Sequence, residues 1–167
     1  MTSALLNFYR GHGADGAGRA IEDIWAWDRR RLEMAHDYMW LFPLPEPGRF
    51  NPTAPPLSTI DIAAFREDAD LRARVCRSLD LMVAFYGLAR RESAVVRRAD
   101  FAVAASWVKP LNHNHLRLTR IMLFLRHVGL GAQAGALLDR LKVIAAHQGA
   151  AAISARTLGF WRASRGV

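Results

Sequence analysis

The fold class is decided by residues 68–87, DADLRARVCRSLDLMVAFYG, in which apolar side chains recur every three or four positions. This spacing puts them on one face of an α-helix and leaves most of the charged side chains elsewhere on its surface. The apolar face comprises Leu71, Val75, Leu79, Met82, Phe85 and Tyr86. Gly87 favours the end of the helix, because glycine adopts the left-handed conformation that follows many helices. We therefore predict a helix from about Asp68 to Tyr86.

Helical spacing recurs along the rest of the chain. Ser58 with Asp61 three residues later is typical of a helix start, because the two residues can cap each other's backbone amides. Further helices are predicted over about 21–39, from Asn112 or Asn114 to Gly129, over 133–147 and over 151–162. Residues 88–100 are expected to form a loop with a short turn. The sequence thus predicts an all-α fold, a single compact domain of about six to seven helices.

Six of the seven prolines lie between Pro43 and Pro56. Each proline ring fixes φ and removes a backbone donor, which excludes this segment from helix interiors and central strands. We expect a long proline-rich crossover loop that Leu44 and Phe50 hold against the helices.

The first residues contain the pattern G-x-G-x-x-G, from Gly11 to Gly16. This pattern binds dinucleotides only where a strand leads into it and a helix follows within a parallel sheet, and an all-α chain lacks such a sheet. The sequence predicts instead a flexible, glycine-rich lead over residues 1–18, followed by a helical domain over residues 19–167.

The formal net charge of +8 lies in the last part of the chain. From Phe101 onward there are nine Lys and Arg residues and one acid, Asp139. A local cationic surface suits an acidic partner, such as a carboxylate, a phosphate or a nucleic-acid backbone. The alternative is that these cations pair with acids of the N-terminal part, which holds all the other acidic residues.

Composition narrows the class of protein. Hydrophobic residues make up 51% of the chain, enough for a core. There is no signal peptide and no apolar run near the ~20 residues of a membrane span, so we expect a soluble, intracellular and cytoplasmic protein. Cys76 is the single cysteine, which excludes an intrachain disulfide and a cysteine cage for a metal. No cofactor site is predicted.

The clearest candidate binding residues are His113, Arg117 and Arg120. They lie at positions i, i+4 and i+7 of the predicted helix after Asn112, and therefore on one face. Such a stripe can hold an anion. A metal site of His113, His115, His36 and Asp37 is a weaker hypothesis. Side chains two positions apart on a helix, such as those of His113 and His115, point in directions about 200° apart. We favour instead a hydrogen-bonded core histidine at His36 and capping of the helix by Asn112 and Asn114. Most of the five tryptophans are expected in the core.

Several motifs resemble the conserved region of the opioid growth factor receptor family. They occur in the family's order and span almost the whole chain. The motifs are Phe8-Tyr9, Asp15-Gly16, HDYMWLFPLPEP at residues 36–47, Phe50-Asn51, Met82 with Phe85-Tyr86-Gly87, and HNHLRLTRI at residues 113–121. The resemblance implies a receptor-type binding module without catalysis. Animal members are associated with binding the peptide Met-enkephalin, and with the nucleus or nuclear membrane.

We therefore expect a non-enzymatic module that binds a peptide or protein between the proline-rich loop and the helix beginning near His113. The expected ligand-binding residues are His36, Asp37, Trp40, His113, Arg117 and Arg120. Arg117 and Arg120 would receive a carboxylate, and Trp40 would face an aromatic ring. The alternative is a protein that binds nucleic acid or phosphate through its basic C-terminal helices. A histidine-based metallo-enzyme is the third hypothesis.

Overall fold

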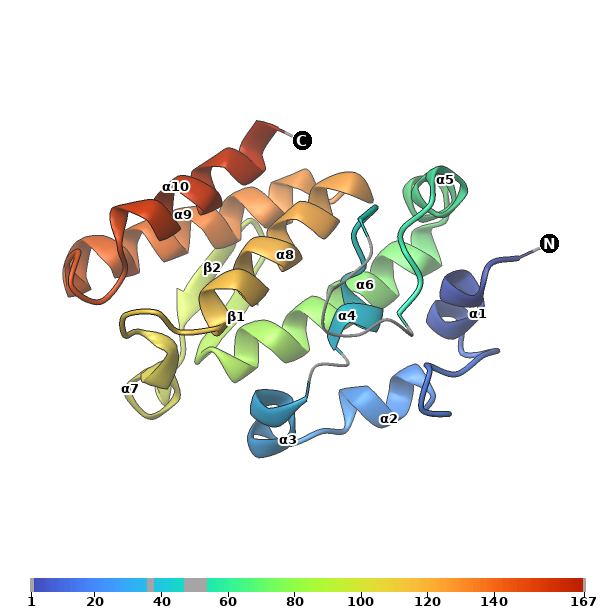
Figure 1. Ribbon diagram of the computed structural model, residues 1–167, viewed down its shortest axis with the longest axis horizontal. Helices are drawn as coiled ribbons and strands as arrows, with labels where there is room; N and C mark the ends of the chain where they lie inside the picture. The colour runs from blue at the N-terminus through green and yellow to red at the C-terminus, as the bar shows by residue number, and fades with distance from the viewer. Residues whose placement is uncertain (1, 36–37, 47–53, 167) are drawn as a thin grey trace. The chain divides into compact units, whose positions relative to one another are not determined.

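The computed structural model describes residues 2–35, 38–46 and 54–166 and is predominantly helical, which confirms the predicted all-α class (Figure 1). The residues group into two compact units, Met1–Leu81 and Met82–Val167. Within the described residues, no helix is both long enough and apolar enough to cross a membrane.

Short helices build the first unit. They span Ala4–Arg10 (α1), Ile21–Trp25 (α2), Arg29–Met34 (α3), Tyr38–Leu41 (α4) and Thr59–Glu67 (α5), and the unit ends within the long helix Ala69–Phe85 (α6). The predicted single helix over about 21–39 is therefore wrong. The Asp28 side chain accepts a hydrogen bond from the backbone N–H of Arg31 at 2.8 Å, so the helix begins anew at Arg29. An aspartate in this role offers the backbone an alternative to continuing the preceding helix.

Helix α1 lies within the predicted lead of residues 1–18. The Ser3 hydroxyl caps it by accepting from the N–H of Leu6 at 3.1 Å, and Gly11 follows it with φ of 78°. Its buried residues are Leu5, Leu6, Phe8 and Tyr9. This part of the lead is thus a packed helix. Removing its apolar side chains from water lowers the free energy of the folded state.

The starts of α5 and α6 follow the sequence signals. Ser58 and Asp61 form the predicted capping box: the Ser58 hydroxyl accepts from the N–H of Asp61 at 3.1 Å, and the Asp61 carboxylate accepts from the N–H of Ser58 at 3.0 Å. Asp68 accepts from the N–H groups of Asp70 and Leu71 at the start of α6, at 2.9 and 3.1 Å. Residues 47–53 of the proline-rich segment lie outside the described residues. Leu44 and Leu57, on either side of them, are joined by a hydrogen bond from the Leu57 N–H to the Leu44 carbonyl at 3.0 Å.

The second unit contains the longer helices. After the end of α6 it comprises the strands Leu88–Arg91 (β1) and Ala94–Arg97 (β2), the helices Phe101–Ala104 (α7), Ala105–Trp107 (η1), Asn114–His127 (α8), Gly131–Gln148 (α9) and Ala155–Ala163 (α10), and the turn Ser164–Gly166 (η2). Helices α8, α9 and α10 pack on one another, and β2 packs against α9 (Figure 1). The predicted helices after Asn114 and Gly131 are close to the observed ones.

Residues 88–97 differ from the expected loop, because they form an antiparallel hairpin. Leu88 pairs with Arg97 and Arg91 with Ala94, around a two-residue turn at Glu92 and Ser93. Each strand has four residues, too few for alternation to stand out in the sequence.

Gly87 separates α6 from the hairpin, as its position in the sequence predicts. Its φ is 72°, and a Cβ atom there would lie 2.6 Å from the Cβ of Ala104. Both the left-handed backbone and the close approach of α7 therefore require glycine.

Candidate ligand-binding surface

The start of α8 carries three of the predicted site residues, and they differ in exposure. His113 is exposed, Arg120 is half-buried and Arg117 is 2% exposed. Upstream, the Asn112 side chain accepts from the N–H of Asn114 at 2.9 Å. The helical spacing is as predicted, but the three side chains do not form one solvent-facing stripe.

Arg117 belongs to a buried polar cluster with Asn114 and Tyr86. The Asn114 side-chain oxygen accepts from the Arg117 guanidinium at 3.3 Å and from the Tyr86 hydroxyl at 3.4 Å. Arg117 and Asn114 are at most 2% exposed and Tyr86 is fully buried. A buried guanidinium is costly unless it is hydrogen-bonded, so these contacts hold the first turn of α8 against the residues that follow α6.

His115 lies between two buried tryptophans of the same unit. Its Nε2 donates to the Trp107 carbonyl at 3.0 Å, and its ring meets Trp107 and Trp161 edge-on at centroid distances of 6.3 and 5.6 Å. The Trp161 indole N–H donates to the His115 carbonyl at 3.1 Å, and that of Trp107 to the Tyr86 carbonyl at 3.2 Å.

This cluster explains the role of His115. Burial lowers its pKa, and the hydrogen bond to Trp107 only partly opposes that effect. His115 is therefore a neutral core histidine that joins η1, α8 and α10. The sequence favoured a core histidine at His36, which lies outside the described residues, and did not single out His115; it favoured a tryptophan core without identifying which residues meet.

The remaining predicted site residues belong to the first unit. Trp40 is 4% exposed and packs edge-on against Phe8 at a centroid distance of 5.3 Å. His36 and Asp37 lie outside the described residues. Among the residues that are described, no three His, Cys, Asp or Glu side chains come together in a way that could hold a metal ion.

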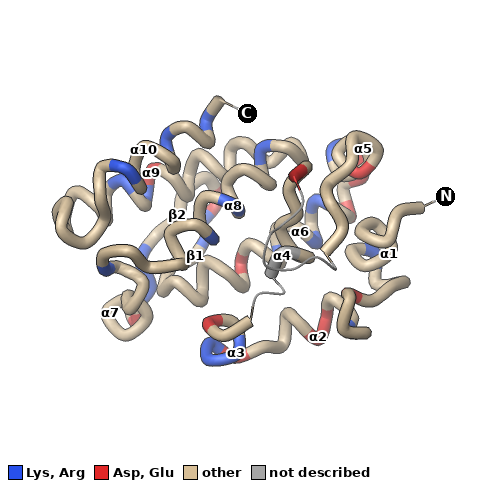
Figure 2. Tube along the Cα trace, viewed as in Figure 1, with Lys and Arg blue, Asp and Glu red and all other residues tan. Residues whose placement is uncertain are grey.

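The two units differ sharply in charge (Figure 2). The second unit holds thirteen Lys and Arg residues and three Asp and Glu residues, a formal net charge of +10, whereas the first has ten and twelve, a net charge of −2. No acidic residue occurs from 101 to 138. Three acids are too few to neutralise thirteen cations, so the second unit has an excess of positive charge of its own.

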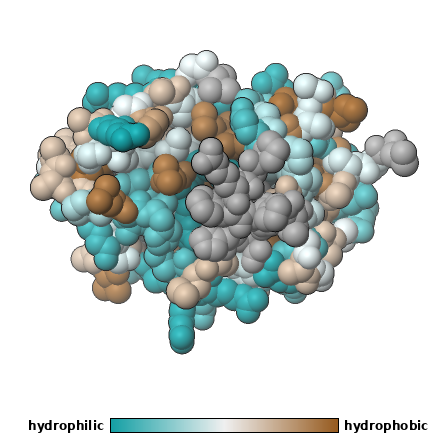
Figure 3. Space-filling view, viewed as in Figure 1, coloured by the Kyte–Doolittle hydropathy of each residue, from teal (hydrophilic) through white to brown (hydrophobic). Residues whose placement is uncertain are grey.

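Apolar side chains are exposed beside these cations. Leu111 is fully exposed with φ of 55°, Leu116 is 65% exposed and Val103 is 82% exposed. Figure 3 shows separate hydrophobic patches among hydrophilic side chains over the molecule. The segment from α7 to the first turn of α8 thus combines Leu111 and Leu116 with Lys109 and His113, and without an acid. Sequence periodicity on α8 could have pointed to Leu116, but not to Leu111 in the preceding loop.

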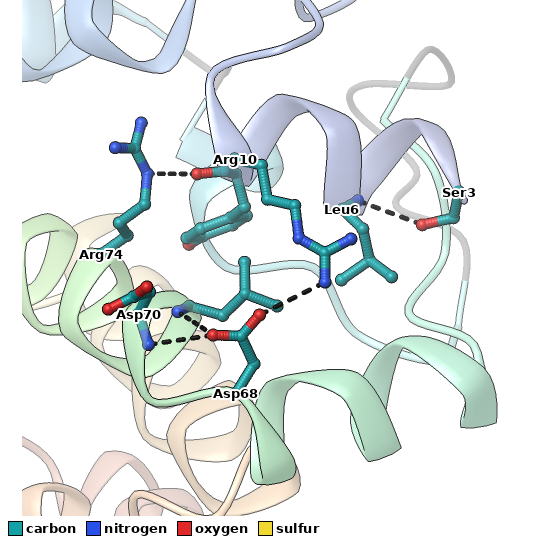
Figure 4. Close-up of polar contacts among 8 residues, drawn as sticks. Ser3, Leu6, Arg10, Asp68, Asp70 and Arg74 are labelled. Carbon is teal, nitrogen blue, oxygen red and sulfur yellow. Dashed lines mark hydrogen bonds and ion pairs between the residues drawn. The ribbon is translucent and has the colours of Figure 1, made fainter.

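The first unit also has a cleft of about 460 Å³. Its charged residues Arg10, Asp68 and Arg74 already form ion pairs within the unit. Arg74 pairs with Glu22 of α2. Arg10 forms an ion pair with Asp68 at 3.3 Å, and Arg74 donates to the Tyr9 carbonyl (Figure 4). These contacts join α1 to the start of α6. The arrangement stabilises the unit and is a weaker candidate for binding than the cationic second unit.

Comparison with known proteins relates the chain to one family. Residues 3–161 match the model of the opioid growth factor receptor (OGFr) conserved region. The opioid growth factor receptors of Mus musculus and Homo sapiens are 39% and 36% identical over 120 residues, which cover 68% of this chain and 19% and 18% of those proteins. Opioid growth factor receptor-like protein 1 of Mus musculus is 32% identical over 118 residues, 67% of this chain and 25% of that protein.

The matched part is thus about a fifth to a quarter of the curated relatives' length. No solved structure matches significantly. The family match covers nearly all of the residues that carried the resemblance in the sequence, and confirms it. The chain belongs to the family of the opioid growth factor receptor conserved region.

Proposed function

We propose that this chain is a non-enzymatic binding module for a peptide or protein segment that carries carboxylates, and that the cationic second unit receives it. The observation that carries this proposal is the charge of that unit, thirteen cations to three acids. The relatives are named receptors, which supports a ligand-binding role. A cytoplasmic location belongs to the same proposal.

The mixture of charge and apolar surface favours a peptide. Leu111 and Leu116 are exposed in the same short stretch of chain as the exposed Lys109 and His113, and a peptide that lies along this stretch can contact both kinds of side chain. Nucleic-acid binding would use the cations and exposed aromatic rings for stacking. Both tryptophans of the second unit, Trp107 and Trp161, are buried, and among its described aromatic residues only Phe160 is exposed, at 48%. The net charge of +10 keeps nucleic acid or phosphate as the second candidate.

The six residues chosen from the sequence remain the proposed ligand-binding residues, and the structure ranks them for testing. His113 and Arg120 have accessible side chains and come first. The buried Arg117 is expected to act by holding the start of α8. Trp40 is 4% exposed, and His36 and Asp37 lie outside the described residues, so these three come last.

The test measures binding by fluorescence anisotropy of N-terminally labelled probes. The probes are Met-enkephalin, a glutamate-rich peptide ending in leucine and a single-stranded DNA of the same length as that peptide. We expect peptide binding that weakens about tenfold in H113A/R120Q, a loss typical of interface charges. R30Q is the control, because Arg30 is an exposed arginine of α3 in the first unit.

Salt dependence separates the two candidate functions. If DNA binds more tightly than either peptide, and its affinity falls steeply between about 0.05 and 0.3 M salt, the nucleic-acid alternative replaces the peptide proposal. Peptide binding that is the same in H113A/R120Q and in R30Q would remove α8 from the site. Circular dichroism of each variant confirms that the helices are retained.

A further inference from the structure

A cleft of about 190 Å³ lies between α9 and α10 within the second unit. Helix α10 turns back along α9, and the two pack together (Figure 1). The cleft is lined by small or apolar side chains and by two cations, Lys142 from α9 and Arg162 from α10. No acidic residue lines it.

Helical geometry sorts these residues along the cleft. Lys142 and Ala146 are one turn apart on α9, and so are Leu158 and Arg162 on α10. Ala150 and Ile153 lie in the connection between the helices, and Ala146 lies in the last turn of α9. Because the helices run in opposite directions, the two cations lie at the other end. The cleft is therefore apolar towards the turn and cationic away from it, and the two regions are about 6 Å apart along each helix.

The side chains leave the apolar end open. Ile153 is 1% exposed and forms the buried part, whereas Ala146 and Ala150 are exposed and small. An alanine on an exposed helix face leaves room that a larger side chain would occupy. This end can accept one apolar side chain from another molecule.

The cationic end keeps its positive charge. The Arg162 side chain has no hydrogen bond or ion pair with any of the described residues. Lys142 contacts Asp139 at 3.2 Å, but Arg165 shares that carboxylate at 3.6 Å. Two cations thus share one acid and the Arg162 side chain is paired with none of the described acids, so these four residues keep a surplus of positive charge that attracts an anion.

We propose that this cleft binds the C-terminal residue of a peptide, with an apolar side chain against Ile153 and Leu158 and the free carboxylate at Lys142 and Arg162. The inference rests on the proposed function, because it assumes a peptide ligand, and it identifies the part of the peptide that is recognised. An apolar group next to a carboxylate matches the two ends of the cleft, whereas a nucleic-acid phosphate offers no apolar group beside its charge.

The experiment uses the full chain labelled with ¹⁵N, and N-acetyl-leucine and N-acetyl-leucinamide as probes. These molecules present the same apolar side chain with and without the negative charge. In ¹H–¹⁵N spectra, N-acetyl-leucine should shift amides between residues 142 and 162, and the amide should bind about tenfold more weakly. K142Q/R162Q should remove the difference between the two probes.

Two further variants complete the test. A146L places a larger side chain in the apolar end and should weaken both probes, while R156Q changes another exposed arginine of α10 that does not line the cleft and should bind as the unchanged chain does. Retained dispersion of the spectra shows that each variant is folded. Equal affinity for the two probes, no binding of either, or unchanged binding by K142Q/R162Q would overturn the assignment.

The outcomes also separate this inference from the proposed function. Selective binding of N-acetyl-leucine without binding of the longer peptides would leave the cleft assigned and remove the peptide-receptor proposal. Binding of the longer peptides that is unaffected by K142Q/R162Q and by amidation of their C-termini would remove the cleft and leave the proposal for the α8 surface.

Discussion

At the scale of single residues, burial decides what the charged and polar side chains of the HNHLR segment do. His113 is exposed, whereas Asn114, His115 and Arg117 are buried and hydrogen-bonded to one another or to neighbouring segments. Four polar residues within five positions thus divide into one accessible side chain and three that hold α8 in place. From residue type, His113 and Arg117 were candidates for an anion site and His113 and His115 for a metal site, while Asn114 was expected to cap the helix.

His115 makes the free energy of unfolding depend on pH. Histidine titrates near 6.5 in an unfolded chain, and burial lowers the pKa of His115 in the folded state. As the pH falls below 6.5, His115 takes up a proton in the unfolded state, and the folded state binds that proton less readily. The contribution of His115 to the free energy of unfolding is therefore fully present above pH 6.5. It is lost as the pH falls from 6.5 towards the folded-state pKa of His115.

Urea unfolding at pH 7.5 and pH 5 tests this prediction. The unchanged chain should lose stability at the lower pH, and H115Q should lose less. H147Q changes an exposed histidine of α9 and should behave as the unchanged chain does. Equal pH dependence in H115Q and H147Q would contradict the role assigned to His115.

At the scale of elements, capping side chains decide where the short helices of the first unit begin. Asp28 starts α3, Ser58 and Asp61 start α5, and Asp68 starts α6. Short helices gain little from their own backbone hydrogen bonds, so caps and packing determine their limits. For this reason the apolar stripe that the sequence shows over residues 21–39 is divided among three helices, α2, α3 and α4.

S58A should destabilise the chain by about 1 kcal/mol, because it removes the acceptor for the N–H of Asp61. T59A is the matched control, since Thr59 is the next residue, is exposed and lies in the first turn of the same helix. Urea unfolding of the two variants measures the difference. A loss in T59A as large as in S58A would mean that the cap does not stabilise α5.

At the scale of the whole molecule, the charge is divided between the units. The second unit carries a net charge of +10 and the first −2. Repulsion among the surplus cations opposes folding of the second unit, and salt screens it. The same surplus is what an anionic ligand would neutralise.

Hydrogen exchange followed by mass spectrometry can measure this effect in each unit separately. Raising the salt concentration from about 0.01 to 0.3 M should slow exchange in peptides from residues 82–167 more than in peptides from residues 1–81. Sodium chloride and sodium sulfate at equal ionic strength control for binding of a particular anion. An equal effect on both units would contradict the role given to the charge surplus.

Local sequence was enough to predict the all-α class, the helix α6 with its end at Gly87, the cap at Ser58 and the family. Each of these depends on neighbours within a few residues, or on motifs that survive as a contiguous string. The cationic character of the C-terminal part could also be counted directly from the residues.

Tertiary packing decided the rest. The contact of Tyr86 with Asn114, which Arg117 also contacts, and that of His115 with Trp161 join residues 28 and 46 positions apart in the chain. The pairing of β1 with β2 is local, but its four-residue strands are too short to show alternation in the sequence. The cleft between α9 and α10 likewise exists only because α10 folds back, which brings Lys142 and Arg162 to the same end. Periodicity shows which residues share a face of a helix, but what covers that face depends on contacts between segments, and those contacts decide whether a cation is structural or available to a ligand.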